Sequence, residues 1–198
     1  MANALLSGEL SALEIARGHD GLLRGMPDPV LLVGLYVSDP QNPESILTVG
    51  RSLHRFRPTK PFPSSVHADR RDLPSVSFVT GRPLQYHLLV IALEEDGGND
   101  VQSVFGALEY PKALSVWSLD EANADLVPLG AFRSERPSRI DLHLETRALH
   151  DVCSSDKCVG ACTWIMRPRL PPATSVFRAG MRARDGKNDW TAVLNVHF

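Results

Sequence analysis

Short hydrophobic runs separated by Pro, Gly, Asn and Asp dominate the chain after residue 28 and predict β-strands joined by turns. Residues 29–37 form a nearly continuous apolar run that ends at a Ser-Asp-Pro turn, which is typical of a buried strand. Residues 84–93 predict a second strand of this kind. Shorter runs predict strands at 46–49, 76–79, 104–109 and 113–117. Between them, the segment 51–71 is rich in Pro, Arg and His and is interpreted as a long irregular connection.

Alternation of apolar and polar residues marks the later part of the chain. Residues 140–145 alternate, and so do residues 177–184, where arginines separate the apolar positions. A turn at 185–189 follows, after which apolar residues occupy every second position from Trp190 to Phe198. The last two segments predict a β-hairpin. About eight short strands of this kind favour a mainly β fold, an antiparallel β-sandwich.

The beginning of the chain carries a different spacing. Leu6, Leu10 and Leu13 recur at helical intervals, and prolines close the segment. We therefore expect residues 1–26 to form a short N-terminal helical appendage and residues 27–198 to form a single β-sandwich domain.

Composition narrows the classes of partner. The 198 residues include 21 Lys and Arg against 23 Asp and Glu, and the resulting net charge of −2 gives no overall attraction to nucleic acid. No segment approaches the roughly 20 apolar residues of a transmembrane helix. The N-terminus lacks the basic start and long apolar run of a secretory signal, so a cytoplasmic location with reduced cysteines is expected.

The segment from Leu88 to Gly106 contains an apolar strand, an acidic loop and then an apolar residue followed by Gly. This arrangement resembles part of a C2 domain. The resemblance implies an eight-stranded sandwich whose loops bind calcium and contact lipid head groups or protein partners, since calcium prefers six to eight oxygen ligands. The alternative is that the acidic loop is a solvated turn. The residues that the resemblance assigns to calcium are Asp39, Glu94, Asp96 and Asp100.

The three cysteines of the chain lie within ten residues, three positions after a histidine. Zinc takes four nitrogen or thiolate ligands, so these residues predict a candidate zinc site. A disulfide with a buried free thiol at Cys162, or a reactive thiol with a histidine as its base, are the alternatives. The four candidate zinc ligands are His150, Cys153, Cys158 and Cys162.

Two further groups of residues have metal-ligating chemistry. His67 and Asp69 have the spacing of a two-histidine, one-carboxylate iron site, with His143 or His150 as the third ligand. The polar side of the segment 140–145 is either a metal patch or a solvated strand face. Its residues are Asp141, His143 and Glu145.

Basic residues gather in the segment 51–71 and predict a surface for phosphate or acidic groups, or a basic loop balanced by neighbouring acids. They are Arg51, Arg55, Arg57, Lys60, Arg70 and Arg71. The sequence has no phosphate-binding Gly-rich loop, no Gly-x-Ser-x-Gly elbow and no zinc-protease helix, which argues against the common enzyme classes.

Three hypotheses follow. The first is a non-catalytic interaction module that binds a protein or a membrane surface through loops of the sandwich. The second is a metal-dependent enzyme or regulator that uses zinc or iron. The third is a structural subunit of a larger assembly.

Overall fold

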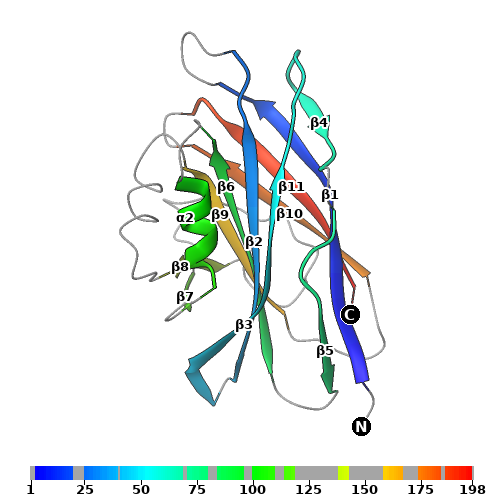
Figure 1. Ribbon diagram of the computed structural model, residues 1–198, viewed down its shortest axis with the longest axis vertical. Coiled ribbons are helices and arrows are strands. Elements are labelled where there is room, and N and C mark those ends of the chain that lie inside the picture. The colour runs from blue at the N-terminus through cyan, green and yellow to red at the C-terminus, as the bar shows by residue number, and fades with distance from the viewer. Residues whose placement is uncertain are drawn as a thin grey trace.

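Alternating side chains build two antiparallel sheets that face each other in the computed structural model of the chain (Figure 1). The structure describes residues 3–19, 25–39, 41–68, 71–79, 84–95, 100–109, 114–118, 138–142, 158–166, 174–183 and 186–197. The strands are β1 (Asn3–Arg17), β2 (Pro29–Asp39), β3 (Asn42–Arg55), β4 (Ser64–Val66), β5 (Val76–Val79), β6 (Gln85–Glu94), β7 (Leu114–Ser118), β8 (Ser138–Leu142), β9 (Cys158–Met166), β10 (Thr174–Arg182) and β11 (Asp189–His197). One helix, α2 (Asp100–Ala107), is present in the described part.

The first sheet has the strand order β10-β11-β1-β4, and β5 also pairs with β1. The second sheet has the order β3-β2-β6-β9-β8-β7. Strands far apart in the sequence are neighbours in both sheets, because β1 pairs with β11 and β6 pairs with β9. The mainly β, antiparallel and sandwich-like class predicted from the sequence is confirmed.

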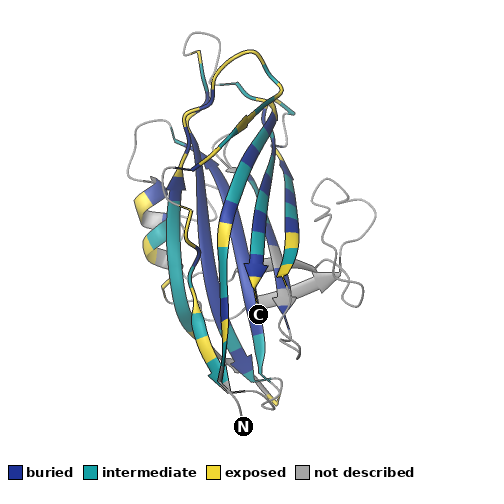
Figure 2. Ribbon diagram, turned by 90° about the vertical axis from the view of Figure 1, so that its right-hand side faces the viewer, coloured by how far each residue is buried: buried dark blue, intermediate teal, exposed yellow. Residues whose placement is uncertain are grey.

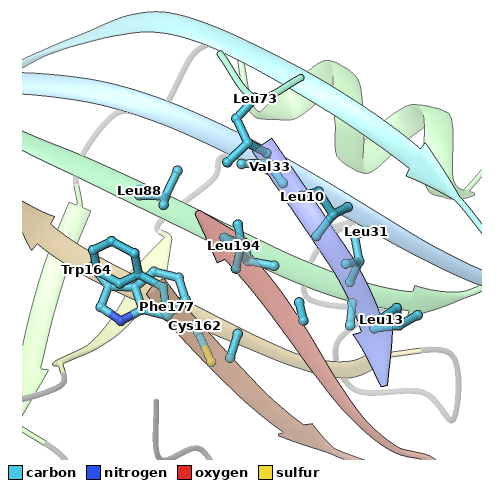
Figure 3. Packing of buried hydrophobic residues seen from close by; sticks show 14 of the residues in the cluster. Leu10, Leu13, Leu31, Val33, Leu73, Leu88, Cys162, Trp164, Phe177 and Leu194 are labelled. Carbon is cyan, nitrogen blue, oxygen red and sulfur yellow. The ribbon is translucent and has the colours of Figure 1, made fainter. Parts of the chain in front are cut away.

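The main hydrophobic core fills the space between the sheets. Leu10 and Leu13 of β1 and Leu194 of β11 lie on one side, facing Leu31 of β2 on the other (Figure 3). At the β9 side of the core, the rings of Trp164 and Phe177 meet nearly edge-on, with 5.0 Å between their centroids. Burial of these side chains is the main source of stability for such a fold.

A second hydrophobic cluster lies on the outer face of the six-stranded sheet. Helix α2 covers β2 and β6 there, and Val101 and Val104 of the helix and Leu108 of the turn after it pack against Leu32 and Ile91 (Figure 1). Because β2 and β6 are buried on both faces, their sequences are continuous apolar runs without alternation.

The predicted N-terminal helix is wrong, since residues 3–17 form β1 inside the five-stranded sheet. The cause is a β-bulge between Leu10 and Ala12 in the pairing with β11. Inward positions are two residues apart before and after it, but the extra residue places Leu10 and Leu13 three apart. The spacing therefore imitates a helix. The segment 1–26, predicted as a helical appendage, thus includes a strand of the five-stranded sheet.

Two further boundaries differ from the sequence prediction. β3 continues to Arg55, where an irregular connection was expected, because its inner positions hold the polar residues Ser52 and His54 and break the apolar alternation. The strand predicted at 104–109 is instead part of α2 and the turn that follows it. The buried positions Val101, Val104 and Leu108 are three and four residues apart, which is the spacing of a helix face.

The C-terminal hairpin is confirmed. β10 and β11 pair in an uninterrupted register from Thr174–His197 to Arg182–Asp189. The predicted apolar positions from Phe177 to Val196 point into the core, and the arginines of β10 point outward. Phe198 lies outside the described residues.

Candidate functional site: a loop at one end of the sandwich

The residues of the predicted basic surface lie in different environments. Arg51 points from β3 toward α2, donates hydrogen bonds to the carbonyl oxygen of Phe105 and to the carboxylate of Glu109, and stacks 4.4 Å above the centre of the Phe105 ring. Arg55 donates from Nε and Nη2 to Glu95 at 2.9 and 2.8 Å. These hydrogen bonds hold the pKa of Glu95 below its usual value. Arg51 and Arg55 therefore form ion pairs with carboxylates of the same chain.

Arg57 and Lys60 lie just after β3 and are exposed. Among the described residues, no carboxylate forms an ion pair with either of them. Arg71 is exposed elsewhere on the chain, and its carbonyl oxygen accepts a hydrogen bond from the Leu10 amide at 2.7 Å. Arg70 lies outside the described residues.

Residues 56–63, here called the tip loop, carry Arg57 and Lys60 at the end of the molecule opposite the N-terminus (Figure 1). The amide of Phe56 donates to the carbonyl oxygen of Pro29 at 3.0 Å, and the Phe56 side chain is buried in the core. Pro58 is also buried. The loop is thus attached to the end of the sandwich at its first residues.

The second half of the tip loop is attached through Phe62, which packs against the main core. A Cβ atom added at Gly18 would lie 3.0 Å from the Phe62 ring and 2.7 Å from Cγ of Pro27, so the glycine leaves room for Phe62. Between these anchors, Thr59 and the two cationic residues point to solvent, and Figure 2 shows the exposed positions at this end. The tip loop is therefore a fixed loop with a cationic outer surface.

The predicted calcium ligands do not meet. Asp39 lies just beyond the Ser38–Gln85 pair at one end of the β2–β6 ladder, and Glu94 pairs with Pro29 at the other. At about 3.3 Å per residue the two are about 30 Å apart, so one ion cannot bind both. The carboxylate of Asp39 accepts a hydrogen bond from the Gln41 amide at 2.8 Å.

The other two calcium candidates do not complete a site in the described part of the chain. Asp96 lies outside the described residues, and Asp100 is the first residue of α2. Glu94 itself is buried.

The predicted zinc ligands are also separated. Cys158 and Cys162 are four residues apart on β9, which places their Cα atoms about 12 Å apart. Two thiolates on one zinc ion lie within about 4 Å of each other, and a disulfide requires Cα atoms within about 7 Å. A zinc site or a disulfide that uses both cysteines is therefore excluded. His150 and Cys153 lie outside the described residues.

Cys162 is a free, buried thiol of the main core, as one of the alternatives predicted. Its Sγ lies 3.7 Å from the carbonyl oxygen of Gly180, and Trp164 lies two residues further along β9 (Figure 3). Burial raises the pKa of the thiol to about 12, so it stays protonated at neutral pH. The thiol is unsuited to nucleophilic chemistry.

The remaining metal candidates are not brought together either. His67 is exposed, and its Nδ1 donates to the carbonyl oxygen of Ser11 at 2.7 Å. Asp141 is a residue of β8, whereas Asp69, His143 and Glu145 lie outside the described residues. Within the described ranges, no group of three or more His, Cys, Asp or Glu side chains is placed to hold a metal ion.

A buried Ser–His pair was not predicted. Ser38 Oγ lies 2.6 Å from His87 Nε2, on the outer face of the six-stranded sheet beside Tyr36. Burial lowers the pKa of His87 to about 4, and no described group bonds its Nδ1. Both side chains are at most 5% exposed, so a substrate cannot reach the hydroxyl. The partners are 49 positions apart in the sequence, so no local pattern could predict the pair.

No described helix is both long and apolar enough to cross a membrane. No protein-family model, curated protein or solved structure matches this chain.

Proposed function

We propose that the chain is a non-catalytic interaction module that binds a partner protein through the tip loop. The observation that carries the proposal is the contrast within that loop. Phe56, Pro58 and Phe62 fix it to the sandwich, whereas Arg57 and Lys60 stay exposed without a described carboxylate partner. A fixed loop loses little conformational entropy when it binds, which favours recognition.

The groups with catalytic chemistry support the same proposal. The Ser38–His87 pair has hydrogen-bonding geometry suited to a nucleophile and base, but it is closed to solvent. The Cys162 thiol is buried, and its pKa of about 12 keeps it protonated. Among the described residues, these side chains with catalytic chemistry are therefore buried and closed to a substrate.

The finer assignment, a C2-like sandwich, stays a prediction. The loop end used in the proposal agrees with the way that C2-like modules are expected to contact partners. The segment of the resemblance, however, contains α2 at the position where a strand was implied.

Charge-reversal variants test the proposed contact surface. Arg57→Glu and Lys60→Glu each change the net charge by two units, and Arg71→Glu is the matched control on an exposed residue outside the tip loop. Tagged variants would be used to enrich partners from an extract of cells that express the chain, with quantitative mass spectrometry of the bound proteins. We expect the same partner to be depleted about fivefold or more with both tip-loop variants and retained with the control.

Equal retention by all variants would refute the contact surface. A loss that is as large for Arg71→Glu would show a nonspecific effect of net charge and would refute it as well. Far-ultraviolet circular dichroism and thermal unfolding of each variant check that the fold is unchanged, as expected for exposed positions.

A further inference from the structure

We infer that the partner presents an acidic protein segment to the tip loop, and that Arg57 and Lys60 bind its carboxylates together. This inference rests on the proposed function and names the chemistry of the partner. It starts from the position of the two cations. They are three residues apart in one loop whose flanking residues, Phe56 and Phe62, are packed into the end of the sandwich.

An arginine–carboxylate contact of the expected kind is already present within the chain. Arg55, two residues before Arg57, binds Glu95 through two guanidinium nitrogens at 2.9 and 2.8 Å. A guanidinium group forms such paired hydrogen bonds with carboxylates because its planar fork matches the two oxygens. Arg57 has the same side chain without a carboxylate from the described residues, so it is free to form the equivalent contact with a partner.

The charge around the tip loop favours a protein segment over a membrane surface. Recognition of anionic lipid typically needs clusters of about four to eight Lys and Arg residues, each contributing modestly. The tip loop offers two such residues, and the exposed carboxylate of Asp28 lies at the same end of the sandwich, where the carbonyl oxygen of Asp28 accepts a hydrogen bond from the Glu95 amide. A broad anionic surface would be repelled by that carboxylate, whereas a short segment can place its carboxylates at two points.

Nucleic acid is disfavoured by the same reasoning. The net charge of −2 gives no long-range attraction to a phosphate backbone, and nonspecific binding to such a backbone requires several phosphate contacts. Two exposed cations on a loop fit a small number of carboxylates. Such contacts act mainly on the association rate and on its dependence on salt.

The test uses a fluorescein-labelled hexaglutamate peptide as the probe, with binding followed by fluorescence anisotropy on the full chain. The double variant Arg57→Gln/Lys60→Gln removes both charges and keeps polar side chains. Arg71→Gln is the matched control. We expect the double variant to bind the peptide about fivefold or more weakly than the wild type, and the control to bind within about twofold. Raising the salt from about 20 to about 200 mM should weaken wild-type binding more than binding of the double variant.

Unchanged binding in the double variant, or no binding of the peptide by the wild type, would overturn the inference. Vesicles containing phosphatidylserine form the second arm, measured by co-sedimentation. Vesicle binding that depends on Arg57 and Lys60, without peptide binding, would replace the protein partner with a membrane. If the charge-reversal variants lose an enriched partner while the peptide is not bound, the contact surface stands and only its acidic partner is wrong. If neither experiment depends on the tip loop, both fail.

Discussion

Replacing Arg51 with alanine should weaken the attachment of the end of α2 to the six-stranded sheet. The guanidinium group donates to the Phe105 carbonyl oxygen, pairs with Glu109 and lies over the Phe105 ring. The Arg51 side chain is 24% exposed and that of Glu109 is 44% exposed, so their ion pair is screened by solvent and contributes only about 0.5 kcal/mol. The hydrogen bond to the carbonyl oxygen adds about 1 kcal/mol. Stacking on the ring adds about 0.5–1 kcal/mol.

These contributions predict that Arg51→Ala lowers the free energy of unfolding by about 2 kcal/mol. Arg55→Ala is a matched control on the same face of the same strand, since it removes a surface pair with Glu95 in which the arginine side chain is 47% exposed. For this control we expect a loss of about 0.2–1 kcal/mol. Urea unfolding followed by tryptophan fluorescence and circular dichroism measures both losses. Hydrogen exchange of the α2 amides should quicken in Arg51→Ala and not in Arg55→Ala.

A double-mutant cycle between Arg51→Ala and Glu109→Ala separates the contribution of the ion pair from that of the Phe105 contacts. Its coupling energy should be about 0.5 kcal/mol, well below the total loss, because most of the stabilisation comes from the Phe105 contacts. A loss for Arg51→Ala no larger than that for Arg55→Ala would refute this account. So would a coupling energy equal to the whole loss, because the ion pair alone would then attach the helix.

Four other perturbations test the fold and its buried groups. Gly34→Ala should destabilise the chain by about 2–4 kcal/mol in urea unfolding, because its Cβ would overlap with Oη of Tyr36 and displace the hydroxyl that donates to the Leu108 carbonyl oxygen. Gly106→Ala, with nothing within 4 Å of the added Cβ, should instead stabilise α2 by about 0.5–1 kcal/mol, and a loss would contradict the helix. The pKa of His87 is lowered from 6.5 to about 4, so the unfolded chain binds the proton more tightly than the folded chain. The free energy of unfolding should therefore fall by up to about 3 kcal/mol as the pH drops from 6.5 to 4. In unfolding titrations, His87→Gln should remove this dependence. The Cys162 thiol should resist iodoacetamide in the native state and react after denaturation, as peptide mass spectrometry would show, whereas native labelling would contradict its burial.

The strands whose signal is local could be predicted from the sequence. β2 and β6 are continuous apolar runs because both of their faces are buried, and the β10–β11 hairpin alternates because one of its faces meets solvent. β1 was misread because a single bulged residue changed the interval between Leu10 and Leu13 from two to three. A hydrophobic pattern counts positions along the chain, whereas a bulge is defined by the partner strand.

The candidate sites also depend on features that the local sequence does not contain. The acidic and cysteine-rich segments contain suitable ligands in a short stretch of sequence, but a strand separates residues by about 3.3 Å each and holds Cys158 and Cys162 too far apart for one ion. The Ser38–His87 pair depends on the register of two strands that lie 49 residues apart. Ligands that are close in the sequence can therefore be far apart in the fold, and a pair such as Ser38–His87 can be close in the fold without being close in the sequence.

The arginines of the basic segment illustrate how register decides the role of a residue. Arg51 and Arg55 lie within the β2–β3 ladder, where the neighbouring elements supply Glu109 and Glu95. The ladder ends at the Val30–Arg55 pair, and the chain then leaves the sheet at Phe56. No strand pairing continues the ladder as far as Arg57, and no described carboxylate forms an ion pair with it. The same side chain, two positions further along, thus changes from a residue paired with Glu95 to an exposed cation without a described carboxylate partner. This change supports the proposal that the tip loop is a contact surface.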